Sequence, residues 1–171
     1  MLKKFYAIFQ TEAGWTGLAG SSSGICRTTL PEKSREVAFQ ALALSGEVQE
    51  SSSDYFTGLI QTFINYYVGL PVEFRVQIDF SGLSSFQKAV YQAAMAIPYG
   101  ETRSYGWIAQ KIGKPLAARA VGQALGRNPL PIIVPCHRVL TAGGGLGGFA
   151  GGLPLKQYLL KLEAKNDTPS R

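Results

Sequence analysis

Hydrophobic residues in the first thirty positions recur in short runs that glycines and polar residues separate. The runs cover residues 5–9, 17–19 and 24–30, and short apolar runs bounded in this way are typical of strands. Gly14 and the polar residues 21–24 lie between the runs, where they predict turns. The pattern therefore predicts an antiparallel meander of three strands.

Two helices are predicted in the remainder of the first half. Val37, Ala41 and Leu44 recur at helical spacing between residues 34 and 44. After a polar break at residues 46–54, a broad apolar face recurs at four-residue steps through Tyr55, Leu59, Phe63 and Tyr67. An aromatic stripe of this kind is core far more often than a ligand site, so we interpret this half as scaffold. Residues 72–80 are predicted to form an extended link.

The second half begins with a helical pattern. One apolar face is formed by Phe86, Val90, Ala93, Ala94 and Ile97. Ser104 is a suitable N-cap for a short helix that continues to Ile112, and a break at residues 113–115 separates it from a second helix over 116–125. Two short helices joined by a tight turn that contains glycine are typical of a helix-turn-helix, whose second helix approaches DNA.

The second of these helices has an unusual composition. Alanine and glycine occupy most of its positions, and Arg119 is its only long charged side chain before Arg127. A helix that reads the major groove carries several polar side chains, so a smooth helix with one arginine suits the narrower minor groove. Tight packing against another helix is the alternative explanation for the small residues.

The next segment, residues 130–140, is predicted to be extended and carries the motif Pro135-Cys136-His137-Arg138-Val139. It places a thiol beside the only histidine of the chain. A thiolate is a strong nucleophile that needs a base or a positive neighbour near neutral pH. A buried thiol next to a surface histidine is the structural alternative. A last helix follows Pro154, with an apolar face formed by Leu155, Tyr158, Leu159 and Leu162, and Glu163 at its end.

A glycine-rich stretch at residues 143–152 lies between this motif and the last helix. Residues 143–148 match the spacing G-x-G-x-x-G, but the helix begins after the glycines and the chain ends too soon for a dinucleotide-binding unit. No G-K-[ST] follows, which excludes a P-loop. Beside a nucleophile, such a loop lets the backbone approach a flat ligand closely.

Charge divides unequally between the two halves. The 171 residues include 46% hydrophobic and 16% charged residues, as in a globular protein of one or two domains. Residues 1–83 hold six basic and eight acidic residues, a balance of −2, and residues 84–171 hold eleven and three, a balance of +8. A basic half suggests a polyanionic partner such as nucleic acid. A solvated basic surface is equally compatible with charge alone.

Several classes of protein are disfavoured. No apolar run reaches the length of a membrane span, and the N-terminus has no pattern of a secretory signal. Cys26 and Cys136 do not make a disulfide framework, which favours a reducing cytoplasm. Two cysteines and one histidine are too few for a Cys/His zinc site, so neither a metal nor another cofactor is expected.

These motifs together resemble the methylated-DNA–protein-cysteine methyltransferases, the family of O6-alkylguanine-DNA alkyltransferases. The resemblance rests on the Pro-Cys-His-Arg-Val motif, the Ala-Ala-Arg-Ala-Val-Gly helix at 117–122, Asn128-Pro129 and the glycine-rich loop. It covers residues 84–163 closely. It implies an α+β fold: an N-terminal domain, 1–83, of ribonuclease-H-like topology and a C-terminal domain, 84–171, with a winged helix-turn-helix.

The resemblance also implies a chemistry. Cys136 would accept the alkyl group from guanine O6 once and keep it, in a single-turnover reaction. His137 would act as base through a bridging water and be oriented by Glu163. Because neighbours on a strand point to opposite faces, Cys136 and His137 are not expected to bond directly, which suits a water link. Asn128 would brace the turn of the site.

The partner that the resemblance implies is double-stranded DNA containing alkylated guanine, bound through its minor groove by a monomer. Arg119 would fill the space of a flipped nucleotide, and Tyr105 would donate a hydrogen bond to the guanine. Backbone groups of Val139 and Ala150 would recognise its edges, and Phe149 would line the pocket. The DNA-binding helix would present Ala117, Ala118, Arg119, Ala120 and Gly122.

Three departures from the family pattern matter. Some relatives have tyrosine at the position of Phe149 and serine at the position of Ala150, which predicts altered substrate tolerance here. The ligands for the structural zinc of some relatives are absent.

Three rival functions are the alternatives to this resemblance. A lesion-binding protein without transfer is opposed by the presence of Cys136. A cysteine hydrolase would take its histidine from elsewhere in the sequence, and a winged-helix regulator leaves the Cys-His pair unexplained.

Overall fold

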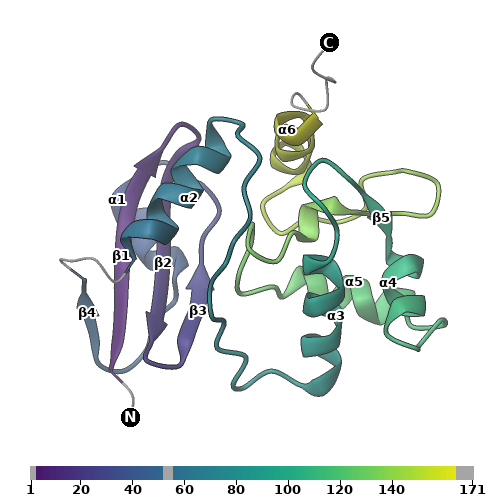
Figure 1. Ribbon diagram of the computed structural model, residues 1–171, viewed down its shortest axis with the longest axis horizontal. Helices are drawn as coiled ribbons and strands as arrows, with labels where there is room; N and C mark the ends of the chain where they lie inside the picture. The colour runs from purple at the N-terminus through teal and green to yellow at the C-terminus, as the bar shows by residue number, and fades with distance from the viewer. Residues whose placement is uncertain (1–2, 52–55, 165–171) are drawn as a thin grey trace. The chain divides into compact units, whose positions relative to one another are not determined.

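A computed structural model describes residues 3–51 and 56–164 of the chain. The chain divides into two compact units, Met1–Ser81 and Gly82–Arg171. The boundary predicted from the sequence, between 83 and 84, lies two residues later. Figure 1 shows the elements of each unit in chain order.

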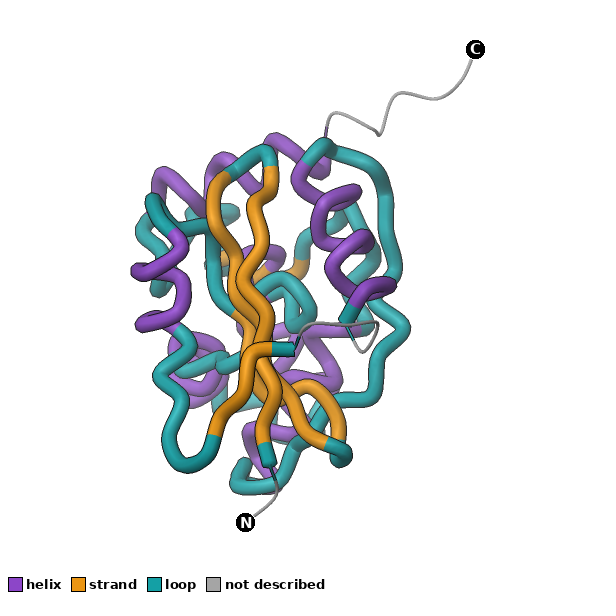
Figure 2. The backbone as a smooth tube through the Cα atoms, turned by 90° about the vertical axis from the view of Figure 1, so that its left-hand side faces the viewer, coloured by secondary structure: helices purple, strands orange, loops and turns teal. Residues whose placement is uncertain are grey.

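The N-terminal unit is built on a four-stranded sheet of order β3-β2-β1-β4. Strands β1 (Lys4–Thr11), β2 (Gly14–Ser21) and β3 (Gly24–Thr28) form the predicted antiparallel meander. Figure 2 shows these strands in orange. A fourth strand that was not predicted, β4 (Val48–Glu50), pairs parallel to β1 at one edge of the sheet. This strand has three residues in a polar stretch, and its pairing with β1 is a tertiary contact that local pattern does not encode.

Two helices cover opposite faces of this sheet. The ring of Phe39 in α1 (Arg35–Ala41) lies 4.9 Å from the ring of Tyr6. The ring of Phe63 in α2 (Thr57–Tyr67) lies 5.9 Å from the ring of Phe9. Because side chains alternate along a strand, Tyr6 and Phe9 point to opposite faces of β1. The predicted aromatic stripe is therefore core, although its first residue, Tyr55, lies outside the described residues.

The segment after α2 belongs to the N-terminal unit. Phe74 packs its ring 4.9 Å from Phe63, and Ile78 forms an isolated parallel bridge with Ile25 of β3. The backbone N–H of Ile25 donates to the carbonyl oxygen of Gln77 at 2.9 Å. The predicted link thus extends the sheet at its β3 edge.

The C-terminal unit contains the predicted helices α3 (Ser85–Met95), α4 (Tyr105–Lys111) and α5 (Ala118–Gly126). Ser84 and Gln87 form a capping box on α3, and the Ser104 hydroxyl accepts from the Trp107 N–H at 3.0 Å on α4. The Tyr91 hydroxyl of α3 donates to the carbonyl oxygen of Ala124 at 2.8 Å, which ties α3 to α5. Caps and apolar spacing thus predicted these helices correctly.

The prediction of an extended segment at residues 130–140 is wrong up to Arg138. Cys136–Arg138 form a 3₁₀ turn, η1, and the short strand β6 (Val139–Leu140) pairs parallel with β5 (Arg103–Ser104). Pro131 and Pro135 lack the N–H that a strand ladder needs. Ile132 is buried with a φ of 75°, a backbone conformation that β-branched residues rarely adopt. The segment is a set of turns, so alternation along a strand does not govern Cys136 and His137.

The last helix, α6 (Leu153–Ala164), buries Lys156, Leu159, Leu162 and Glu163. Tyr158 is 40% exposed, so its predicted packing is wrong. Lys156, Leu159 and Glu163 are spaced three and four residues apart and share one face of the helix. Over residues 3–51 and 56–164, no helix combines the length and apolar character needed to span a membrane.

Candidate active site

A cavity of about 730 Å³ lies within the C-terminal unit, between α4, α5, η1 and the glycine-rich loop. Seven residues predicted as site residues line it: Tyr105, Ala118, Arg119, Gly122, Cys136, Phe149 and Ala150. Most of its wall is apolar, as in pockets that bind flat organic ligands. Cys136 contributes a thiol to this wall, which makes it the candidate nucleophile.

Cys136 begins the turn η1, and its backbone N–H donates to the carbonyl oxygen of Val134 at 2.8 Å. Burial raises the pKa of its thiol above the ordinary value, while a hydrogen bond with Asn128 and the charge of Lys156 act in the opposite direction. The thiol therefore keeps its proton at neutral pH. Nucleophilic attack by Cys136 needs a base to take that proton.

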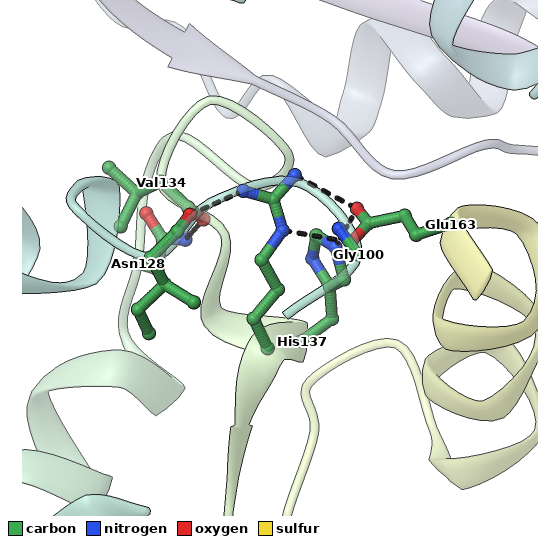
Figure 3. Close-up of polar contacts among 7 residues, drawn as sticks. Gly100, Asn128, Val134, His137 and Glu163 are labelled. Atoms are coloured by element: carbon green, nitrogen blue, oxygen red, sulfur yellow. Dashed lines mark hydrogen bonds and ion pairs between the residues drawn. The ribbon is translucent and has the colours of Figure 1, made fainter. Parts of the chain in front are cut away.

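His137 and Glu163 form a buried pair. Nε2 of His137 lies 2.6 Å from Oε1 of Glu163, and the two residues are 0% and 2% exposed. Figure 3 shows Glu163 on α6 directed toward the ring of His137. Burial lowers the pKa of His137, although Glu163 acts to raise it. The imidazole is therefore neutral at pH 7, which is the form that accepts a proton.

The Glu163 carboxylate has two further partners. Arg138 donates to both of its oxygens, from Nε at 2.9 Å and from Nη2 at 3.0 Å. The backbone N–H of Gly100, labelled in Figure 3, donates to Oε2 at 3.3 Å. Burial acts to raise the pKa of Glu163, but the hydrogen bonds from His137 and Arg138 outweigh it and lower the pKa to about 2. Glu163 is thus ionised throughout the neutral range.

Asn128 holds the turn that leads into Cys136. Its Nδ2 donates to the carbonyl oxygen of Val134 at 2.9 Å, a contact drawn in Figure 3, and its Oδ1 accepts from the Leu130 N–H at 2.9 Å. These two bonds bracket Ile132, the residue with positive φ. A strained backbone persists where its surroundings over-determine it. Asn128 supplies part of that constraint.

The glycine-rich loop closes on Tyr105. Gly147 has a φ of 69°, and a Cβ at this position would meet the Tyr105 hydroxyl at 2.8 Å, so only glycine fits without a shift. Lys156 is fully buried under this loop and donates from Nζ to the carbonyl oxygens of Val139 at 2.7 Å and Gly148 at 3.3 Å, and to that of Leu146. The glycine-rich loop was predicted to approach a ligand closely, and in the structure it also approaches Tyr105.

Six predicted residues do not line the cavity. Val139 is fully buried, and its carbonyl oxygen accepts from Lys156. Ala117 is the N-cap residue of α5, and Ala120 is exposed on that helix. The other three are His137 and Glu163, which contact each other, and Asn128, which contacts the turn before Cys136.

Comparisons with known proteins agree with this site. Residues 85–165 match the family profile described as 6-O-methylguanine DNA methyltransferase, DNA binding domain. A methylated-DNA–protein-cysteine methyltransferase of Methanosarcina acetivorans is 41% identical over 162 residues, which cover 93% of this chain and 97% of that protein. The chain belongs to the methylated-DNA–protein-cysteine methyltransferase family. Its enzymatic activity is accordingly that of a methylated-DNA–protein-cysteine methyltransferase.

Other members of the family support the assignment. A methylated-DNA–protein-cysteine methyltransferase of Mycolicibacterium paratuberculosis is 51% identical over 115 residues, which cover 67% of this chain and 69% of that protein. A crystal structure of Mycobacterium tuberculosis OGT in complex with DNA superposes with a TM-score of 0.81 at 40% identity, covering 94% of this chain and 93% of that chain. The predicted mixed α+β fold is therefore confirmed at the level of the family.

Two buried cations beside the site, Arg138 and Lys156, were not predicted as site residues. Arg138 is 8% exposed although it belongs to the motif around Cys136. Lys156 shares the apolar face of α6 with Leu159, and a charged residue on such a face was the available signal. Burial lowers the pKa of Lys156, while Cys136 acts to raise it.

The buried His137–Glu163 pair predicts that acid destabilises the C-terminal unit. The folded pKa of Glu163, about 2, lies below the ordinary 4.5, so the unfolded chain binds its proton first as pH falls. The folded pKa of His137 is also lowered, so its contribution to the free energy of unfolding is lost as pH falls below about 6.5. The carboxylate alone corresponds to roughly 3 kcal/mol, lost as pH falls from about 4.5 to about 2.

The measurement is urea unfolding at several pH values between 7 and 3, followed by Trp107 fluorescence in a Trp15→Phe background, because these are the two tryptophans of the chain. Glu101→Gln serves as a control for exposed carboxylates, because it removes the exposed carboxylate that pairs with Arg103. It should keep the acid sensitivity of the unaltered protein. Equal stability at pH 7 and pH 3 would contradict the prediction.

Proposed function

We propose that the protein repairs duplex DNA by moving the alkyl group of O6-alkylguanine to Cys136, once per molecule. One observation carries this proposal: the thiol of Cys136 lines an apolar cavity, and the next residue is a buried histidine whose Nε2 lies 2.6 Å from a buried carboxylate oxygen. O4-alkylthymine, which also carries an alkyl group on a ring oxygen, is a second substrate of the same chemistry.

The proposed reaction is an in-line displacement. A bridging water passes the thiol proton of Cys136 to His137, whose Nε2–H donates to Glu163 and whose Nδ1 is then the basic nitrogen. The sulfur forms a bond to the alkyl carbon, the bond from that carbon to guanine O6 breaks, and its electron pair leaves with the purine. Tyr105 donates a hydrogen bond to the leaving base, which then takes up a proton from water, and His137 returns the proton of the thiol to water. Burial raises the pKa of Tyr105, so its hydroxyl remains a donor.

The base reaches Cys136 by nucleotide flipping, because O6 is inaccessible within the stack. Helix α5 supports this proposal, since its exposed Arg119 lines the cavity that contains Cys136, and its small residues permit close approach to the minor groove. In this proposal α4 and α5 form the helix-turn-helix of a winged C-terminal domain. The N-terminal unit has ribonuclease-H-like topology and acts as scaffold.

Recognition of the flipped base is proposed to involve the walls of the cavity. Phe149 packs on the base, and the backbone N–H of Ala150 donates to its oxygen, both from the glycine-rich loop. Backbone groups at Cys136 and Val139 read its amino edge. All these residues lie between positions 105 and 163 of one chain, which is why we propose that a monomer is sufficient.

A titration tests the proposal. Excess alkylated duplex is incubated with a known amount of active protein, and we expect product to reach a plateau at about one alkyl group per molecule, because a thioether has no route back to a thiol here. Mass spectrometry should find the added mass on the peptide that contains Cys136, and the Cys26 peptide is the internal control. Product that rises linearly past one equivalent, or modification at Cys26, would refute the mechanism.

A further inference from the structure

Arg138 is buried two residues after the candidate nucleophile, and each of its three guanidinium nitrogens has a hydrogen-bond partner. Its Nε and Nη2 donate to the two oxygens of Glu163, and its Nη1 donates to the carbonyl oxygen of Ile97 at 2.8 Å. The guanidinium carbon lies 5.7 Å from the centre of the Tyr99 ring. A two-point bond of this kind fixes the plane of the carboxylate as well as its position. The reaction proposed above gives this arginine no role.

The Glu163 oxygen that accepts from Arg138 Nη2 is also the oxygen nearest His137. Oε1 lies 3.0 Å from Nη2 and 2.6 Å from His137 Nε2. The positive charge of Arg138 balances the negative charge of Glu163, and His137 contacts this ion pair as a neutral ring. Three charged groups act on His137: Glu163 and Lys156 from α6, and Arg138 from η1. The backbone N–H of Gly100 also donates to Glu163.

We propose that Arg138 is a positioning residue for alkyl transfer: it holds Glu163 in the plane that receives His137 Nε2–H and balances the carboxylate charge, so that His137 remains an unprotonated base. The inference rests on the proposed function, which makes His137 the acceptor of the thiol proton. Arg138 acts through Glu163 and His137 and does not touch the substrate.

The physical reason is the cost of an unbalanced buried charge. If Arg138 were neutral, Glu163 would be left as a buried anion, and protonation of His137 would be the nearest way to balance it. An imidazolium ion has no lone pair with which to accept the proton of Cys136. Burial is the largest cause that lowers the pKa of His137, and the positive charges of Arg138 and Lys156 lower it further. Glu163 acts to raise this pKa.

The single histidine of the chain makes this directly measurable. Imidazole nitrogen shifts of untagged, ¹⁵N-labelled protein report whether His137 is protonated and which nitrogen carries the proton. In the unaltered protein we expect a neutral ring with the proton on Nε2 at pH 7. In Arg138→Met we expect His137 to titrate above the ordinary imidazole value. A His137 that titrates at the same pH in both proteins would overturn the proposal.

Two further variants separate charge from packing. Arg138→Met/Glu163→Gln removes both charges, and we expect the ring to be neutral at pH 7 again. Arg138→Lys keeps the charge and loses the two-point bond, so the ring should remain neutral while transfer slows. Where Arg138→Met does not fold, Arg138→Lys carries the test, and a protonated ring in that variant would refute charge balance. Arg75→Met is the matched control, because Arg75 also donates from Nε and Nη2 to one carboxylate, on the exposed surface of the N-terminal unit.

The rate of transfer from free O6-alkylguanine gives an independent readout. In Arg138→Met we expect at least about a tenfold loss at pH 7, because each unit by which the pKa of the base rises above the working pH removes tenfold of its active form, with recovery as pH rises. A purely structural role would lower the rate at every pH and leave the profile unshifted. If the unaltered protein transfers no alkyl group, the proposed function fails. The nuclear magnetic resonance measurement still tests whether Arg138 keeps His137 unprotonated.

Discussion

Cys136→Ala is expected to abolish alkyl transfer completely and to leave the affinity for DNA within about threefold of the unaltered protein. The reaction needs a sulfur that can form a bond to carbon, and alanine offers none. Binding to DNA is expected to come mainly from contacts of basic side chains with phosphates, and the change adds no charge and removes none at neutral pH, since burial keeps the thiol protonated.

Two measurements check this expectation. The alkylated guanine that remains in a duplex is quantified after incubation with excess protein, and the affinity of the same preparation for unmodified duplex is measured at several salt concentrations. Cys26→Ala is the matched control, because Cys26 is the second free cysteine and lies in β3 of the N-terminal unit. It should transfer at an unchanged rate. Residual transfer by Cys136→Ala would show that another residue is the acceptor.

Local pattern predicted those parts of the fold that local interactions determine. Ser84 and Ser104 mark the beginnings of α3 and α4 because their hydroxyls satisfy backbone donors within the same four residues. Residues 130–140 show the limit of this reasoning. Their apolar side chains are buried, as expected of a strand, but two prolines and the bonds of Asn128 hold the backbone in turns. Burial and conformation are separate properties there.

The candidate site was only partly readable for a related reason. The adjacency of Cys136 and His137 is visible in the sequence, whereas the approach of Glu163 to His137 joins residues 26 positions apart. Only the family resemblance suggested that contact. Arg138 and Lys156 were missed because a basic residue is expected at the surface. Their partners are a carboxylate and backbone carbonyls from other elements, which no spacing rule reveals.

The second large effect concerns Arg119, which is exposed on α5 and lines the cavity. We expect Arg119→Ala to slow repair of alkylated duplex by on the order of 10²-fold, and reaction with free O6-alkylguanine by less than about threefold. Extruding a base costs a few kcal/mol, and each 1.4 kcal/mol is about tenfold in rate. The duplex reaction alone needs a side chain that fills the vacated space, because a free base has no stack to leave.

Arg127→Ala is the control that separates this role from charge. Arg127 follows α5 and is exposed, but it does not line the cavity. Both variants lose one positive charge, so both should weaken DNA binding and flatten its salt dependence to a similar degree. Single-turnover rates at saturating duplex remove that binding effect, and under these conditions only Arg119→Ala should remain slow. Equal loss on duplex and free base would mean that Arg119 supports the fold or the chemistry. Equal rates for the two arginine variants on duplex would mean that extrusion does not depend on Arg119.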